Sequence, residues 1–378
     1  VVINDNVTDV TYLDTDVTLG TSYCYTARAK VGDAVSGYTS SATIKYNVTP
    51  TVKVANASNG IKVSWSTAAN ATGYTVYRST YSNGKWSGWK NMGTAKANKT
   101  AWTDKNVKTG VAYKYTVRAA YGKILSSYNK SGASVVFLNT PAVKIANNAT
   151  GMKVAWSKVA GATGYVIYSS QYDPTTNSWS KWANRGTVNA NSWIDTYAQS
   201  GVTYKYTVRA LNGKSLSAYV SSGALMYLAQ PTVTIANASK GINVSWSQSA
   251  GATGYTVYRS EYDAKTKKWS SWKSRGTAAA DKSSWVDKKV TSGKYYKYTV
   301  RAINGNTKST YVSSKSLYYL AEPVTTVTVV DNGINVAWTQ SEGAQGYTVY
   351  RSEYNTKTKK WSSWKNMGTA KPDKTNWT

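Results

Sequence analysis

The chain has 378 residues, and its 46 lysines and arginines against 17 aspartates and glutamates give a net charge of +29. Histidine is absent and Cys24 is the single cysteine, which excludes an internal disulfide, a Cys/His zinc site and a histidine general base. No run of 18 apolar residues occurs, so we predict no transmembrane segment in this sequence, which we interpret as a window from a longer chain.

Residues 1–49 are interpreted as the second half of a repeating unit. YCYTARA at 23–29 matches the YKYTVRA of later units, and Tyr12 stands where those units carry a tryptophan. This segment has five acids and three bases, so residues 50–378 carry a net charge of +31. The positive charge therefore belongs to the repeats and is spread along them.

Residues 50–140 are predicted to form the first complete unit. In GIKVSWS at 60–66, Ile61, Val63 and Trp65 alternate with polar residues, and YKYTVRA at 113–119 has the same period of two. This period is typical of strands with one face toward a core. Turn signals separate about seven short strands, a spacing that predicts a β-sandwich.

The unit then repeats along the chain. GIKVSWS returns as GMKVAWS at 151–157, GINVSWS at 241–247 and GINVAWT at 333–339. We therefore predict complete units at 141–230 and 231–322, and the first half of a unit at 323–378. The linkers are very short, so we expect the units to follow one another with little freedom.

The units resemble fibronectin type III domains. The second predicted strand carries a core tryptophan, Trp65, and V-x-x-G-x-x-Y-x-Y-x-V-R-A follows at 107–119. The resemblance implies an all-β tandem array of seven-stranded, immunoglobulin-like sandwiches. It also implies that Tyr113, Tyr204 and Tyr296 are the tyrosines whose hydroxyl bonds back across a strand corner. The chain looks most similar to tandem modules of secreted and surface proteins of Gram-positive bacteria.

Two tryptophans three residues apart recur in every unit, as in KWSSWK at 268–273 and 360–365. Residues i and i+3 of a strand point to opposite faces, so we expect one indole to cover the core edge and the other to face outward. Tyr77, Lys114 and Arg118 are predicted on the outward face, where an exposed cation–π contact contributes about 0.5–1 kcal/mol.

This surface has two interpretations. It is either an aromatic–cation ladder that stiffens each unit, or a contact face for glycan rings or for another copy of the chain. The candidate contact residues are Trp86, Trp89, Trp179, Trp182, Trp269, Trp272, Trp361, Trp364, Tyr77 and Arg118.

The high positive charge indicates anionic partners, such as anionic glycans or cell-wall polymers. Sequence-specific binding of nucleic acid is not expected, because no recognition helix is predicted. We also expect no cofactor, no metal and no catalytic residue. The few acids near the tryptophans, such as Asp173 and Asp263, recur in hairpin turns instead of facing one another across a cleft.

Three functions remain open. The first is a non-catalytic stalk or filament, extracellular or on the cell surface, whose units contact neighbouring units or other copies of the chain. The second is a spacer or carbohydrate-binding accessory region of a larger secreted glycan-degrading enzyme, and the third is a soluble lectin. We expect the partial units to reflect an arbitrary division of a longer array; alternatively, the front half of one chain is completed by the back half of the next.

Overall fold

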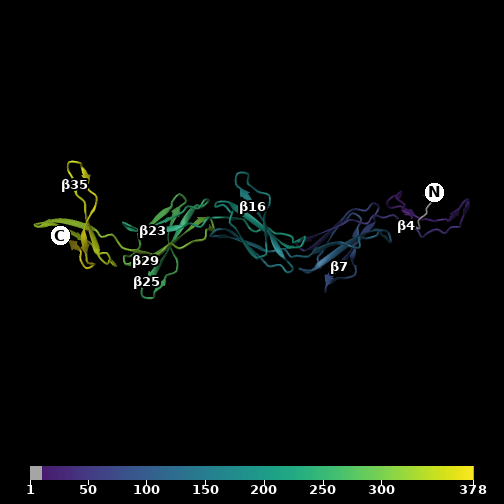
Figure 1. Cartoon of the computed structure of the whole chain (residues 1–378), viewed down its shortest axis with the longest axis horizontal. Coiled ribbons are helices and arrows are strands. Elements are labelled where there is room, and N and C mark those ends of the chain that lie inside the picture. Colours follow the sequence, from purple (N-terminus) through teal and green to yellow (C-terminus); the bar gives the residue numbers. More distant parts are fainter. Residues whose placement is uncertain (1–10, 378) are drawn as a thin grey trace.

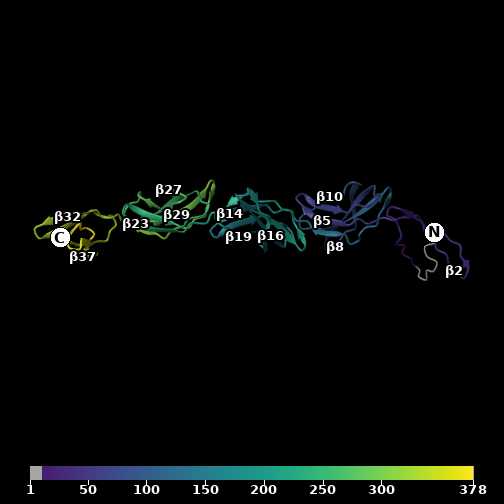
Figure 2. The same cartoon turned by 90° about the horizontal axis from the view of Figure 1, so that it is seen from above.

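The structure, a computed structural model, describes residues 11–377. They form an extended row of β-sheet units, with the ends of the chain at opposite ends of the row (Figure 1, Figure 2). The predicted all-β class is confirmed, because no helix occurs within residues 11–377. Residues 1–10 of the first predicted partial unit and Thr378 lie outside the described residues.

The first complete unit contains two antiparallel sheets. Its strands are β5 (Val52–Ala57), β6 (Gly60–Trp65), β7 (Gly73–Ser82), β8 (Lys85–Trp86), β9 (Lys90–Lys96), β10 (Ala101–Asp104), β11 (Ala112–Tyr121), β12 (Ile124–Leu125) and β13 (Ala133–Val136). One sheet has the order β10-β6-β5, and the other places β9, β7, β11 and β13 side by side. The short β8 and β12 extend the tips of β7 and β11. This is the strand order of a fibronectin type III sandwich, and the predicted fold is confirmed.

The next two units repeat this arrangement strand for strand. The second contains β14 (Val143–Asn148), β15 (Gly151–Trp156), β16 (Gly164–Asp173), β17 (Ser178–Trp179), β18 (Ala183–Val188), β19 (Ser192–Asp195), β20 (Thr203–Asn212), β21 (Ser215–Leu216) and β22 (Leu225–Met226). The third contains β23 (Val233–Ala238), β24 (Gly241–Trp246), β25 (Gly254–Asp263), β26 (Lys268–Trp269), β27 (Lys273–Ala279), β28 (Ser284–Asp287), β29 (Lys294–Asn304), β30 (Thr307–Lys308) and β31 (Leu317–Tyr319).

Partial units lie at both ends of the described chain. Residues 11–48 contain β1 (Ser22–Tyr23), β2 (Lys30–Val31), β3 (Ala34–Val35) and β4 (Ile44–Lys45). Residues 323–377 contain β32 (Thr325–Val330), β33 (Gly333–Trp338), β34 (Tyr347–Arg351), β35 (Tyr354–Asn355), β36 (Lys360–Trp361), β37 (Lys365–Ala370) and β38 (Asn376–Trp377). Ile334 is 54% exposed, whereas its counterpart Ile61 is fully buried, because the strands that cover Ile61 have no equivalent here.

Each core is filled by the inward-facing residues of the two sheets. In the first unit Ile61, Val63 and Tyr115 are fully buried, and Trp65 packs against Tyr74 with ring centroids 5.5 Å apart. Burial of one such apolar side chain contributes about 1.5–3 kcal/mol.

The expected tyrosine corners are also present. Each hydroxyl accepts a hydrogen bond of 2.9 Å from the backbone N–H five residues upstream, and the three residues are Tyr113, Tyr204 and Tyr296.

A buried aspartate links the two sheets of each complete unit. Asp104, at the end of β10, is 1% exposed and accepts hydrogen bonds from Tyr115 Oη at 2.9 Å and Arg78 Nη1 at 2.7 Å. In the second unit Asp195 accepts the same bond from Tyr206 at 2.9 Å, and a serine replaces the arginine. A buried carboxylate is costly unless it is paired, so these donors are required for the sandwich.

Neighbouring units meet through backbone atoms. Gly161, in the loop between β15 and β16, lies so close to Gly110 that a Cβ on Gly161 would stand 2.3 Å from Gly110 Cα. The φ angles of Gly110 and Gly161 are +80° and +79°, a left-handed conformation that favours glycine. The same approach recurs at the next two junctions, where the corresponding distances are 2.4 Å for Gly251 and 2.5 Å for Gly343. A side chain on Gly161, Gly251 or Gly343 would therefore move the two units apart.

Hydrogen bonds of asparagine form a second attachment at the first two of these junctions. Asn56 Nδ2, on β5, donates to Val136 O at 2.9 Å and, across the junction, to Leu216 O at 3.0 Å. Asn147 spans the next junction in the same way and donates to Lys308 O at 3.2 Å. Two separate attachments, one through glycines and one through asparagine, oppose bending between the units.

The connecting segments also belong to the cores that they join. Leu138 is fully buried in the core of the second unit and Leu228 in that of the third, although both precede the predicted boundaries at 141 and 231. The boundaries themselves remain predictions. A residue anchored in the following core leaves no free linker between the sandwiches.

We expect Gly161→Ala to destabilise the junction and to bend the row, because its new Cβ would meet Gly110. Gly213→Ala is the matched control, since Gly213 also has a positive φ but has no neighbouring atom where a Cβ would lie. Both variants carry a strain of about 1–2 kcal/mol from the left-handed backbone, and only Gly161→Ala adds the clash. Thermal unfolding and small-angle X-ray scattering measure the two effects; equal behaviour of the variants would contradict the role of this contact.

We also expect stability to fall at alkaline pH. Burial, reinforced by the adjacent aspartates, raises the pKa of Tyr115, Tyr206 and Tyr298 well above the usual value of about 10. The folded chain keeps these hydroxyls protonated while the unfolded chain releases their protons, so the stabilisation is complete below about pH 10 and is lost as the pH rises further. Urea midpoints between pH 8 and 11 measure this loss. Tyr206→Phe, which removes one titrating group, should show a shallower decline; an identical decline would refute the assignment.

Candidate contact face

The first tryptophan of each pair packs between a tyrosine and a lysine. Trp86, on β8, lies against Tyr81 with ring centroids 5.2 Å apart, and Lys114 Nζ stands 4.2 Å from the centroid of the indole. The lysine distance is 4.1 Å in the second unit and 4.3 Å in the third. The residues there are Tyr172, Trp179 and Lys205, and Tyr262, Trp269 and Lys297.

The second tryptophan belongs to another trio on the same sheet. Trp89 meets Tyr128 edge-on with centroids 6.3 Å apart, and the Arg118 guanidinium lies 5.6 Å from the centroid of that tyrosine. The corresponding residues are Trp272, Tyr311 and Arg301 in the third unit, and Trp182, Tyr219 and Arg209 in the second. We call the two trios of a unit its ladder face.

Neither indole of a pair belongs to the core, so the expectation that one of them covers the core edge is wrong. Trp86 and Trp89 both lie over side chains that point away from the core. The strand is interrupted between them, because residues 87–89 have no strand geometry and β9 begins at Lys90. The alternation of a continuous strand therefore does not apply across the pair.

The serine between the tryptophans fixes this interruption. Ser87 Oγ accepts a hydrogen bond from Thr80 N at 3.0 Å, and Ser79 Oγ donates to Ser87 O at 2.7 Å. The hydroxyls of Ser180, Ser270 and Ser362 accept the equivalent backbone bond in the later units. The serine thus replaces a regular strand pairing at the point where the chain bends, and both indoles turn onto the outer face.

Tyr77 and Arg118 also lie on this outer face. Arg118 Nε donates to Ser126 O at 2.6 Å, which holds the guanidinium against the sheet. Tyr77, on β7, is partly buried and stands opposite Thr116 of β11. Thr116 points outward yet is only 1% exposed, so the aromatic and cationic side chains cover the middle of the sheet almost completely.

Exposure of the tryptophans depends on the strand that supplies the lysine. Trp361 and Trp364 are 69% and 72% exposed, and the last partial unit has no counterpart of β11 within residues 11–377. Among the complete units, Trp182 is the most exposed member of the pairs at 38%. Contacts within each complete unit therefore bury much of the indole surface that we had predicted to be a contact face.

The tyrosines of the second trio were missed from the sequence. Tyr128, Tyr219 and Tyr311 recur at the same offset after YKYTVRA, in SSYNK, SAYVS and STYVS. That recurrence could have identified these tyrosines as part of the repeated surface. The side of the sheet on which they lie depends on the short hairpins formed by β12, β21 and β30, which no periodicity reveals.

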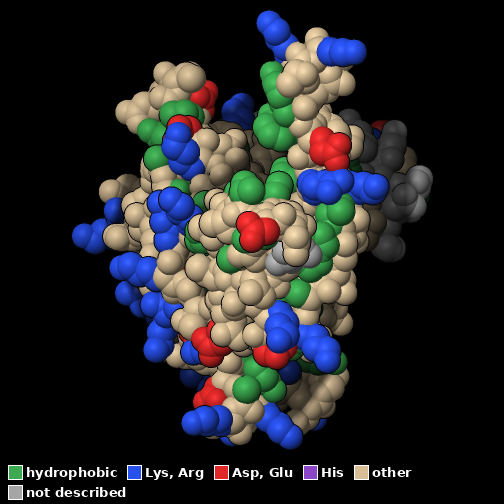
Figure 3. All heavy atoms as spheres, turned by 90° about the vertical axis from the view of Figure 1, so that its left-hand side faces the viewer, with side chains coloured by type: hydrophobic (Ala, Val, Ile, Leu, Met, Phe, Trp, Pro, Cys, Tyr) green, Lys and Arg blue, Asp and Glu red, His purple; other side chains and the backbone are tan. Residues whose placement is uncertain are grey.

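The hairpins that carry the first tryptophan of each pair project to alternating sides of the row. In Figure 1 the hairpins of β16 and β35 point upward, whereas those of β7 and β25 point downward. Figure 3 looks along the row from the C-terminal end, and basic side chains greatly outnumber acidic ones on the face that it shows. A ligand or a second chain would therefore meet similar basic, aromatic surfaces on two sides.

The acidic side chains near the tryptophans accept hydrogen bonds within the hairpin turns. Asp173 Oδ1 accepts bonds from the Thr175 hydroxyl and amide, which lower the pKa of the Asp173 carboxyl.

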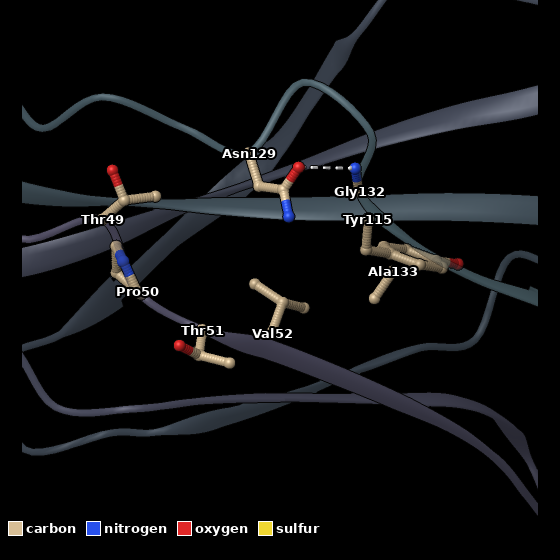
Figure 4. Close-up of a pocket in the computed structure, with 8 residues that line it drawn as sticks. All are labelled: Thr49, Pro50, Thr51, Val52, Tyr115, Asn129, Gly132 and Ala133. Carbon is tan, nitrogen blue, oxygen red and sulfur yellow. Dashed lines mark hydrogen bonds between the residues drawn. The ribbon is translucent and has the colours of Figure 1, made fainter.

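Within residues 11–377 no group of three or more His, Cys, Asp or Glu could hold a metal ion, and no helix could span a membrane. A cavity of about 200 Å³ beside Pro50, Val52 and Tyr115 (Figure 4) is smaller than the roughly 300 Å³ of typical ligand sites.

We expect Trp86→Ala to destabilise the first unit by about 1–2 kcal/mol, since it removes both the cation–π contact and buried ring surface. Trp361→Ala is the matched control, because Trp361 is in the same place of the repeat but is mostly exposed. Its cost should stay below about 0.5 kcal/mol. Urea unfolding measures both, with hydrogen exchange across β7 locating the loss. Equal costs would show that the lysine-capped stack contributes nothing.

Comparison with known proteins adds one curated relative, and no family model matches the chain. Exoglucanase B of Cellulomonas fimi is 25% identical over 344 residues, which cover 80% of this chain and 27% of that protein. The chain therefore spans about a quarter of the length of this relative.

Similar solved structures include three chicken proteins. The FN1–FN3 domains of CNTN1 are 15% identical (TM-score 0.23, 71% of this chain and 97% of that chain), and a two-domain fibronectin type III segment of tenascin is 16% identical (0.29, 48% and 100%). The interferon gamma receptor alpha chain is 10% identical (0.29, 47% and 97%). The strand order and tyrosine corners of the structure itself identify the fold: this chain is a tandem array of fibronectin type III β-sandwiches.

Proposed function

We propose that this chain is a non-catalytic, extracellular structural region of a bacterial protein, a stiff stalk or filament segment. Its ladder faces make repeated contacts with other copies of the chain or with anionic glycans and cell-wall polymers. The observation that carries the proposal is the junction: paired glycines meet at three successive junctions, and a bridging asparagine joins the complete units at the first two of them.

Stiffness follows from how the junction is built. Sandwiches joined by free linkers move relative to one another by default. Here the hydroxyl of Ser200 donates to Ala250 O at 2.8 Å, and that of Ser292 donates to Glu342 O at 2.7 Å, beside the glycine contacts. Bending a junction would break these bonds and withdraw Leu138 or Leu228 from the following core.

Adhesion follows from repetition. A stiff row with tryptophan-bearing hairpins on alternating sides can engage a surface or a neighbouring chain at several points. Each weak contact then raises the effective concentration for the next one. The net charge of +29 draws the row toward anionic polymers and is screened by salt.

A second candidate is a spacer within a secreted glycan-degrading enzyme. The 25% identity to Exoglucanase B of Cellulomonas fimi favours it, because that protein is nearly four times as long as the matching region. In this hypothesis the sandwiches still form a stiff row, and glycan hydrolysis takes place in another part of the polypeptide. A catalytic domain in the same gene would support it.

Electron microscopy of the native, full-length protein at low and high salt tests the stalk. We expect straight rods in which successive units keep one angle, and side-by-side or end-to-end association at low salt. A Gly161→Ala/Gly251→Ala variant should give bent particles. Freely jointed strings of beads from the unmodified protein would refute the proposal.

A further inference from the structure

Because the units repeat, the residues at one position can be compared between units. The third unit departs from the first two beside its junction with the residues that follow it. Lys294, Tyr295 and Tyr318 stand where the first unit has Val111, Ala112 and Val136. On the facing loop Glu342 stands where the two earlier junctions have alanine. Polar or aromatic groups thus replace small or apolar ones at four positions of one junction.

These departures lie together in space. The rings of Tyr295 and Tyr318 are 4.7 Å apart, and Tyr262 meets Tyr295 edge-on at 6.3 Å. Lys294 Nζ forms an ion pair of 2.7 Å with Glu261. The Tyr295 side chain remains 46% exposed after these contacts. Three tyrosines therefore form one partly open aromatic wall.

This wall borders a groove of about 810 Å³, which runs from the hairpin at the end of β25 to Glu342 in the next unit. The volume is within the roughly 300–1,000 Å³ of typical ligand sites. Ser292 and Gly293, which form the junction, also line the groove. The groove is open enough for an extended molecule to lie along it.

The lining of the groove also contains basic side chains. Lys265, Lys273 and Arg275 line it, and none of them has an acidic partner within residues 11–377. The carboxylate of Asp263 lies there too, where it accepts hydrogen bonds from the backbone N–H groups of Lys265 and Thr266 in the hairpin turn. The acid Glu261 is already paired with Lys294 and lies 3.7 Å from Arg259. Unpaired cations facing tyrosine rings suit a ligand that has both ring faces and negative charge.

We propose that this groove binds an acidic saccharide, a chain of pyranose rings that carries carboxylate or sulfate groups. The apolar faces of the sugar rings pack on Tyr295 and Tyr318, and the anionic groups lie against Lys273 and Arg275. Glu342 accepts hydrogen bonds from sugar hydroxyls at the rim. The site deepens the anionic-glycan contact of the proposed function, on which it rests, and assigns it to one groove; a single isolated chain would bind as well as an assembled one, so failure here would leave the stiff stalk standing.

Packing of the junction alone does not account for the cluster. The earlier junctions form the same glycine contact without these side chains. Tyr318 does reach the following unit, where its hydroxyl donates to Gly343 O at 3.3 Å. The ring contacts of Tyr295 and the ion pair of Lys294 are made within the third unit, and Lys294 also interacts electrostatically with Glu342 across the junction.

Isothermal titration calorimetry of the whole chain with trigalacturonic acid, a chondroitin sulfate hexasaccharide and neutral cellotriose tests this site. The key variant, Lys294→Val/Tyr295→Ala/Tyr318→Val, restores the residues with which the first unit folds. It should bind the charged probes about tenfold more weakly or worse, because two rings and one cation are lost. Tyr311→Ala is the control, since Tyr311 is 47% exposed on the ladder face of the same unit.

Binding of either charged probe by the unmodified chain, lost in the triple variant and kept in Tyr311→Ala, would support the site; the charged probe that binds identifies the carboxylate or the sulfate form. Three results would overturn it. These are no binding of the charged probes, equal binding of cellotriose, or equal binding by the triple variant. A change in thermal stability of the triple variant without a change in affinity would assign the residues to the junction and would equally overturn the site.

Discussion

The close approach of two glycines at three successive junctions is the constraint on which the rest of the structure depends. Because no Cβ fits between Gly110 and Gly161, the loops that carry them meet at backbone distance. The asparagine on the first strand then reaches the hairpin of the next unit, and the linker has room only to enter the following core. One short contact thereby sets the angle between units, and its repetition places the tryptophan-bearing hairpins on alternating sides of the row.

Tryptophan and lysine have opposite preferences at a protein surface, since tryptophan is usually buried and lysine is usually exposed to water. The ladder face satisfies both. The indole of Trp86 packs against the Tyr81 ring, and the ammonium group of Lys114 lies 4.2 Å from the indole centroid. The outer face of the sheet is thus covered without a second layer, which explains how outward-pointing residues such as Thr116 become buried. The high charge then keeps a tyrosine-rich surface soluble.

Much of the fold could be predicted because its signals are local and repeated. Alternation in GIKVSWS predicted which residues are buried in β6, and the spacing before YKYTVRA predicted the tyrosine corners. The tryptophan pair was placed wrongly because that prediction assumed one continuous strand, whereas Ser87 interrupts it. The junction contacts join glycines 50 or 51 positions apart, and no periodicity links a turn glycine in one unit to a loop glycine in the next. Their recurrence was visible in the sequence; their meeting was not.

The junction also explains where the array can vary. The junction between residues 11–48 and the first complete unit has Asn70 beside Gly20 in place of a second glycine. At the other three junctions a Cβ on the second glycine would stand 2.3–2.5 Å from the Cα of the first, so a side chain there would move the units apart. The residues immediately beside these glycines are not restricted in this way: Lys294 follows Gly293, and Glu342 precedes Gly343. Substitutions at these flanking positions alter the chemistry of the crevice between two units while the backbone contact keeps its shape. A repetitive row can therefore gain a distinct surface at a single junction without losing its straightness, and the third junction has the composition that such a change would produce.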